Sequence, residues 1–160
     1  MLFPQKLFLF LLRISIGLLF FYAGISKVLN PAWSAAGYLT HAKTFAGFYA
    51  WLASPALLPF INFLNEWGLT LLGVALLLGL FVRLSGILGA VLMLFYYFPA
   101  LKFPYVPPNA FLADEHIIYI FALLVLVVFN AGNTWGMGLW LKECGKKKGE
   151  EIKPQCHDGI

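Results

Sequence analysis

A few ionisable and phenolic side chains beside long apolar runs carry most of the chemistry that this sequence offers. Lysine and histidine side chains can donate hydrogen bonds to a polar substrate, and a neighbouring carboxylate can accept a proton. Glu66, Glu115 and His116 are the candidate catalytic residues on these grounds. The candidate substrate-binding residues are Arg13, Lys27, Tyr96, Tyr119 and Asp114.

The composition determines what kind of element must position these side chains. The chain has 160 residues, of which 61% are hydrophobic and only 11% are charged. A soluble domain of ordinary composition has about 25% charged residues to cover its surface. The sequence therefore predicts an all-α integral membrane protein.

Residues 65–101 set the arrangement of the predicted helices. A bilayer core of ~30 Å takes roughly 20 helical residues to cross, so this apolar segment is long enough for two crossings. Arg83, followed by Ser85 and Gly86, interrupts it near the middle. Because a cation at the bilayer centre is costly, we place a turn there and predict two helices, over about 65–82 and 84–101.

Two further apolar segments complete a predicted transmembrane four-helix bundle, with helices over about 7–29 and 114–131. The intervening loop 30–64 is rich in aromatic residues, which favour the headgroup region. Residues 42–53 have aromatic and apolar side chains at helical spacing, which predicts a short interfacial helix. Pro55 and Pro59 are expected to end it before the second crossing.

The distribution of cations predicts the orientation. Lys6, Arg83 and the basic C-terminal segment fall on one side of the predicted bundle, so both termini are expected to be cytoplasmic in a multi-pass protein of the cell membrane. We predict a transmembrane domain over 1–140 and a basic, disordered cytoplasmic tail over 141–160. The candidate residues Lys27, Glu66, Asp114, Glu115 and His116 then gather at the outer end of the bundle.

Two simpler interpretations remain open for these residues. Acids at helix N-termini and bases at helix C-termini complement the helix dipole, and the predicted positions of Glu66, Asp114, Glu115 and Lys27 fit that role alone. Arg13 lies about two turns inside the first helix. It is either a side chain that extends to the headgroups or an inward-facing cation that binds an acidic partner or polar ligand.

Other classes of site have little support. Cys144 and Cys156 are too far apart for a close-spaced zinc pair, and we predict no metal site. His41 and His116 lack a predicted geometry for haem. Basic-aromatic stripes of the kind that bind nucleic acids are absent from the sequence, so nucleic acid is not an expected partner.

Three stretches resemble the DoxX family of membrane proteins. LLRISIGLLFFYAGISKVLNP is similar to the family's first helix, with its Arg, its Gly-Leu-Leu-Phe run and its small-residue-Lys ending. The central stretch AGFYAWLASPALLPFINFLNEWGLTLLGVALLLGLFVRLSGILGA resembles the family's Glu-Trp-Gly entry and Gly-Leu-Phe-x-Arg turn, and DEHIIY resembles its fourth-helix entry. The likeness covers about residues 7–140. The positions that match recurring polar places of the family are Arg13, Lys27, Glu66, Trp67, Arg83, Asp114, Glu115 and His116.

The resemblance implies a four-helix membrane subunit that works with quinone and sulfur compounds. The family includes subunits of thiosulfate:quinone oxidoreductase and members that associate with redox enzymes. Quinone would then be a substrate and not a bound cofactor, and a redox subunit or a second copy of the chain would be a partner within the lipid bilayer. The alternatives are a non-catalytic membrane anchor or assembly factor for a partner oxidoreductase and, ranked last, a small transporter.

Overall fold

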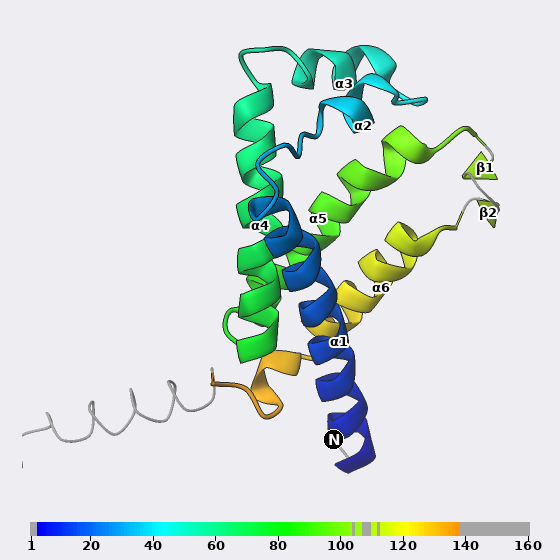
Figure 1. Ribbon diagram of the computed structural model, residues 1–160. Coiled ribbons are helices and arrows are strands. Elements are labelled where there is room, and N and C mark those ends of the chain that lie inside the picture. Colours follow the sequence, from blue (N-terminus) through cyan, green and yellow to red (C-terminus); the bar gives the residue numbers. More distant parts are fainter. Residues whose placement is uncertain (1–2, 104, 107–109, 112, 138–160) are drawn as a thin grey trace, which may run out of the picture.

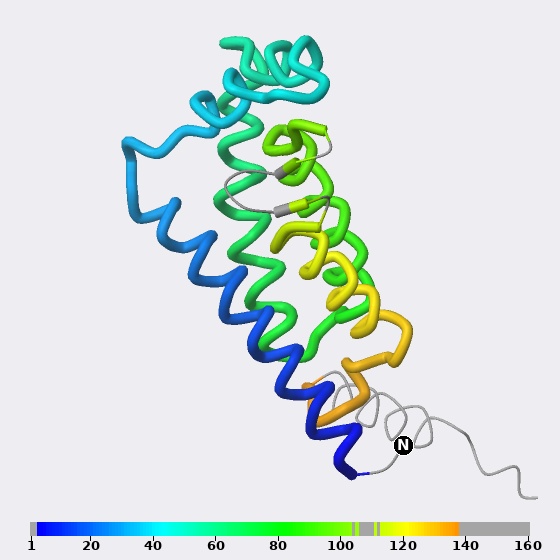
Figure 2. The backbone as a smooth tube through the Cα atoms, turned by 90° about the vertical axis from the view of Figure 1, so that its right-hand side faces the viewer, coloured from blue at the N-terminus to red at the C-terminus, as the bar shows by residue number. Residues whose placement is uncertain are grey.

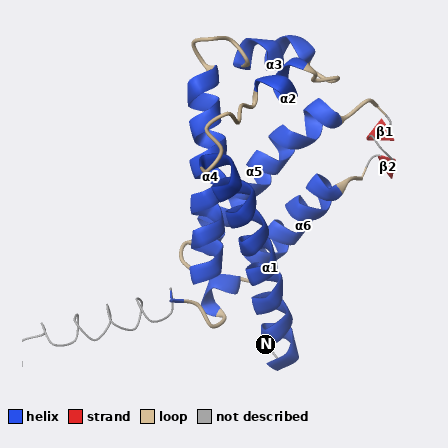
Figure 3. Cartoon of the chain, in the orientation of Figure 1, coloured by secondary structure: helices blue, strands red, loops and turns tan. Residues whose placement is uncertain are grey.

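The computed structural model describes residues 3–103, 105–106, 110–111 and 113–137, and helices make up most of this part of the chain (Figures 1 and 3). A two-residue strand β1 pairs in antiparallel register with a two-residue strand β2 in the connector before the last α-helix. The elements in chain order are α1 (Phe3–Val28), α2 (Ala36–Thr40), α3 (Ala46–Leu52), α4 (Leu58–Leu78), α5 (Val82–Ala100), β1 (Tyr105–Val106), β2 (Ala110–Phe111), α6 (Glu115–Val128) and the 3-10 helix η1 (Ala131–Asn133).

Three of these helices, α1, α4 and α5, are long and apolar enough to cross a membrane. The predicted all-α membrane class is therefore confirmed. The last predicted crossing, 114–131, is shorter in the structure, because α6 has 14 residues. At 1.5 Å per residue this helix is only about 21 Å long.

The long helices pack as two pairs, α1 against α4 and α5 against α6 (Figure 2). Helices α1 and α4 come close together because Gly73 of α4 lies at their contact. A Cβ added at Gly73 would lie 2.3 Å from the backbone nitrogen of Phe21 in α1. Small residues at such crossings let membrane helices reach van der Waals contact. The fully buried side chains of Phe20, Leu76 and Leu123 then form the core between the two pairs.

The turn between α4 and α5 comes earlier than the sequence predicted. Gly79 has a φ of 70° and caps α4 in the left-handed conformation, and Phe81 (φ 47°) precedes the first residue of α5. Glycine ends helices in this way because it has no Cβ to oppose positive φ. Arg83 is therefore an exposed residue in the first turn of α5 and not the turn itself.

The start of α4 also differs from the prediction. Pro59 lies in the first turn of α4, where its missing N–H is not needed, so it begins the crossing and does not separate it from the loop. Glu66 consequently lies more than two turns inside α4. The interpretation of Glu66 as an acid at a helix N-terminus was wrong, whereas Asp114 does cap α6 by accepting from the backbone N–H groups of His116 and Ile117.

Residues 30–57, the part of the predicted loop 30–64 that precedes α4, form a cap across one end of the long helices (Figure 2). It contains α3, within the predicted helix 42–53, and also the short α2, which the sequence did not reveal. Leu39 and Tyr49 are buried in a small core of their own beneath the cap. We call residues 30–57 the cap from here on.

Arg13 lies in α1 and contacts the segment that follows α6. Its side chain is 1% exposed. Its Nη1 donates to the carbonyl oxygens of Ala131 (2.8 Å) and Thr134 (2.9 Å), and its Nη2 donates to that of Trp135 (3.3 Å). The interpretation of Arg13 as a side chain reaching the headgroups was wrong: this cation donates to three backbone carbonyl oxygens of the segment that follows α6.

We expect Arg13→Met to lower the free energy of unfolding by about 3 kcal/mol, because three carbonyls each lose a hydrogen bond worth ~1 kcal/mol. Thermal and chemical unfolding in detergent would measure this effect. The matched control is Arg83→Met, whose exposed side chain should contribute almost nothing. Equal stability of the two variants would contradict the structural role of Arg13.

Candidate ligand-binding chamber beneath the cap

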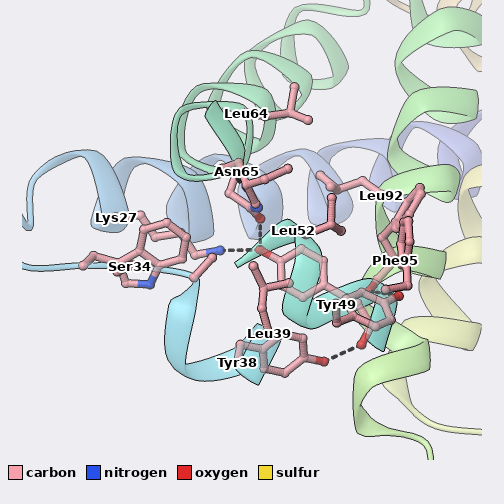
Figure 4. A pocket seen from close by; sticks show the side chains of 15 residues that line it. Lys27, Ser34, Tyr38, Leu39, Tyr49, Leu52, Leu64, Asn65, Leu92 and Phe95 are labelled. Atoms are coloured by element: carbon pink, nitrogen blue, oxygen red, sulfur yellow. Dashed lines mark hydrogen bonds between the residues drawn. The ribbon is translucent and has the colours of Figure 1, made fainter. Parts of the chain in front are cut away.

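A cavity of about 370 Å³ lies between the cap and the adjoining ends of α1, α4 and α5. This volume falls in the range of small-molecule sites, ~300–1,000 Å³. Most of the lining is aliphatic or aromatic, and a few polar groups converge on one part of it (Figure 4). We call this cavity the chamber. Its lining residues are Lys27, Trp33, Ser34, Ala35, Tyr38, Leu39, Phe48, Tyr49, Leu52, Ile61, Leu64, Asn65, Leu92, Phe95 and Tyr96.

The cap is attached to α5 where a proline disrupts the helix. Pro99 lies inside α5 and has no N–H, so the carbonyl four residues earlier, that of Phe95, loses its helical partner. The hydroxyl of Tyr49 donates to this carbonyl oxygen at 3.1 Å. Tyr49 is only 2% exposed, so the cap supplies a buried donor where the helix lacks one.

Three further hydrogen bonds join the cap to the same end of α5. The hydroxyl of Tyr38 donates to the carbonyl oxygen of Tyr96. The backbone N–H of Lys43 donates to the Pro99 carbonyl oxygen at 3.0 Å, and Thr44 Oγ1 donates to that of Leu101 at 2.6 Å. These bonds hold the cap over the chamber.

Both cap tyrosines are donors at neutral pH. Burial raises the pKa of Tyr38 to about 12, with smaller contributions from Tyr49 and from the charge of Asp114. Burial also raises the pKa of Tyr49. Each hydroxyl therefore keeps the proton with which it binds a carbonyl of α5.

The polar groups of the chamber meet at the hydroxyl of Tyr96. Lys27 Nζ, from the last turn of α1, donates to Tyr96 Oη at 2.8 Å, and Tyr96 Oη donates to Asn65 Oδ1 of α4. Figure 4 shows Lys27 and Asn65 approaching from their separate helices. The ammonium also lies over two rings, 4.8 Å from the centroid of Trp33 and 5.1 Å from that of Tyr96. An ammonium has three donors, so Lys27 can also bind an acceptor in the chamber.

Asp114 and His116 form a hydrogen-bonded pair that packs against Tyr96. His116 Nδ1 lies 2.6 Å from Asp114 Oδ2, and the His116 ring stacks on Tyr96 with centroids 5.9 Å apart. Asp114 thus has two roles: it caps α6 and it orients the imidazole of His116. The pair links the start of α6 to the wall of the chamber.

The structure brings together some of the predicted site residues and separates others. Lys27 and Tyr96 line the chamber, and His116 and Asp114 adjoin it through Tyr96. Glu66 does not line it. Three others are elsewhere: Arg13 binds the chain after α6, Glu115 is exposed, and Tyr119 packs against the central core.

Of the fifteen lining residues, only Lys27 and Tyr96 were predicted as site residues; the other thirteen include the polar or aromatic residues Trp33, Tyr38, Tyr49 and Asn65. The aromatic residues were interpreted only as headgroup anchors, because nothing in the sequence shows which of them turn inward. Two signals in the sequence were available. Asn65 is an amide in an apolar helix. Pro99 lies four residues after Phe95, so the Phe95 carbonyl needs a donor from outside the helix. In the part of the chain that the structure describes, no three His, Cys, Asp or Glu residues gather as metal ligands would.

These features define a helical membrane protein with an apolar, capped chamber and one cationic polar group inside it. The chain belongs to the DoxX family: the model of that family, described as DoxX, matches residues 8–101, more than half of the sequence. Comparison with curated proteins gives no match, and neither does comparison with solved structures. The resemblance noted in the sequence is thereby confirmed at the level of the family.

A double-mutant cycle tests how the cap is attached. Tyr49→Phe should cost about 1–2 kcal/mol of stability, because the Phe95 carbonyl is left without a donor. In the Pro99→Ala background the same change should cost less, since the restored backbone N–H can pair with that carbonyl. Unfolding in detergent and hydrogen exchange over residues 46–52 would measure both.

The control for this cycle is Tyr105→Phe, because the Tyr105 side chain is exposed and lies outside the cap. An equal cost of Tyr49→Phe with and without the proline would show that Pro99 does not create the need for Tyr49.

Proposed function

We propose that this chain is a membrane subunit of a quinone-linked redox complex and that the chamber binds the quinone ring. The observation that carries this proposal is the combination of a largely apolar cavity with the hydrogen-bonded cluster of Lys27, Tyr96 and Asn65. A quinone needs apolar walls for its ring and tail and hydrogen-bond donors for its oxygens. The family supports a membrane role of this kind.

The chamber suits a ligand that enters from the bilayer. Leu64 of α4 and Phe95 of α5 line it, and both are also about half exposed on the outer surface of the helices. The apolar lining therefore continues to the lipid-facing side between α4 and α5. We assign the isoprenoid tail to this opening and the ring to the inner part, beside Lys27.

Reduction of a quinone takes two electrons and two protons and yields a quinol. In the proposed site, Lys27 donates a hydrogen bond to one quinone oxygen and stabilises the charge that develops there. The Tyr96 hydroxyl gives its one hydrogen to Asn65 and accepts from Lys27, which holds the ammonium in place, and His116, oriented by Asp114, supplies protons from the outer side of Tyr96. The partner subunit supplies the electrons from an anionic sulfur compound such as thiosulfate.

The membrane arrangement in this proposal is a bundle of four crossings in the cell membrane. The segment around α6 completes the fourth crossing with the residues that flank this short helix. Phe3 and Trp135 make a ring contact at 5.8 Å, so both ends of the described chain lie on one side, which we assign to the cytoplasm. The cap and the chamber then lie at the outer face.

Retention of quinone by the purified protein is the direct test of the site. Protein extracted in mild detergent should carry quinone that solvent extraction and mass spectrometry detect. Lys27→Met should lower its affinity about tenfold, because a hydrogen bond from a charged donor is worth ~1.5 kcal/mol or more. Tyr96→Phe should have a smaller effect in the same direction.

The matched control is Lys102→Met, since Lys102 is an exposed cation that does not line the chamber. Thiosulfate-dependent quinone reduction in membranes, with and without the candidate partner subunit, tests the redox role separately. If wild-type protein holds no quinone, or if both lysine variants hold it as wild type does, the chamber is not a quinone site.

A further inference from the structure

A second cavity, of about 460 Å³, lies on the exposed side of the cap between α2 and the end of α5. We call it the groove. Tyr38 lines both the groove and the chamber, so one side chain separates the two. The residues of the groove are Gly37, Tyr38, His41, Lys43, Pro99 and Ala100.

Two nitrogen-bearing side chains, those of His41 and Lys43, line the groove. His41 Nδ1 lies 2.7 Å from the carbonyl oxygen of Gly37. A carbonyl only accepts, so Nδ1 carries a hydrogen. Nε2 is an acceptor in the neutral imidazole and a second donor in the imidazolium. The backbone N–H of Lys43 donates to the Pro99 carbonyl oxygen, and the hydroxyl of the next residue, Thr44, donates to the Leu101 carbonyl oxygen. Among the residues that the structure describes, neither His41 nor Lys43 has a carboxylate within 4.0 Å.

The position of the groove places it at the level of lipid headgroups. The three candidate membrane spans end on this side at Val28, Leu58 and Ala100, and Ala100 is itself a groove residue. The cap around it exposes the large aromatic side chains of Phe45 and Trp51. Aromatic residues gather where a protein passes through the headgroup layer. The commonest oxyanion at that depth is phosphate.

We propose that the groove is a binding site for a phosphate oxyanion, with the His41 imidazolium and the Lys43 ammonium as its donors. The phosphate comes either from the headgroup of an anionic phospholipid or from solution, because the same groups bind both. A phosphate bound here contacts the cap and the end of α5 together, beside the hydrogen bonds that hold the chamber closed. The site stands apart from the proposed quinone site and requires no quinone.

The first experiment uses the full chain in detergent, analysed by native mass spectrometry with phosphatidylglycerol or phosphatidylcholine. Wild-type protein should retain phosphatidylglycerol preferentially, and Lys43→Gln should lower this retention about fivefold, the usual effect of one interfacial cation. His41→Gln combined with Lys43→Gln should abolish the preference. Lys102→Gln, an exposed cation outside the groove, is the control and should leave it unchanged.

A second pair of variants separates charge from folding. A Cβ at Gly37 would meet no atom within 4 Å, so side chains are accommodated there. Gly37→Glu places a carboxylate at the groove and should abolish the preference for the anionic lipid, whereas the isosteric Gly37→Gln should keep it. Calorimetric titration of wild-type protein with inorganic phosphate distinguishes the two sources of the ligand.

Preference for phosphatidylglycerol that depends on the groove supports a lipid headgroup, and saturable binding of inorganic phosphate that depends on the same residues supports a soluble anion. The proposal is overturned if wild-type protein binds neither ligand selectively. It is also overturned if the double variant and Gly37→Glu behave as wild type.

Discussion

The missing N–H of Pro99 is the constraint on which the candidate site depends. A carbonyl without a partner near the membrane is costly, because no water is available there to replace the lost bond. The chain meets this need with Tyr49, a residue of the loop before α4, and adds bonds from Tyr38, Lys43 and Thr44 to the same helix end. A disruption in one helix thereby fixes the cap, and the cap closes the chamber.

The same principle operates at the other end of the molecule. There the buried guanidinium of Arg13 donates to the carbonyl oxygens of Ala131, Thr134 and Trp135 in the segment that follows α6. Arginine suits it because its donors are arranged in a planar fork that reaches several acceptors at once. Arg13 hydrogen-bonds α1 to the end of the described chain. Tyr38 and Tyr49 hydrogen-bond the cap to α5. Between these two sites, α1 and α4 are in close contact at Gly73.

Composition and helix length were sufficient to predict the all-α membrane class and the approximate spans, because a bilayer imposes both. The bounds were less accurate: Gly79 and not Arg83 ends α4, since a left-handed glycine stops a helix more directly than a cation does. Among the site residues, Lys27 and Tyr96 were predicted from their types and their level in the bundle. Asn65, Tyr38 and Tyr49 were not, because their roles depend on how the cap folds back over α5, which local periodicity does not encode. Arg13 and Glu115 were predicted as site residues but do not line the chamber. A polar residue in an apolar chain can instead stabilise the fold, as Arg13 does, or face solvent, as Glu115 does.

The central claim is that a quinone ring binds in the chamber beneath the cap, and photocrosslinking would test it most directly. A photoreactive quinone would be bound to the protein in membranes, and the labelled peptides identified by mass spectrometry. We expect labels on the chamber residues of α4, α5 and the cap, around Asn65, Tyr96 and Trp33. These labels should disappear when excess natural quinone competes. Labels confined to exposed residues elsewhere on the described helices, or labels that competition leaves unchanged, would contradict it.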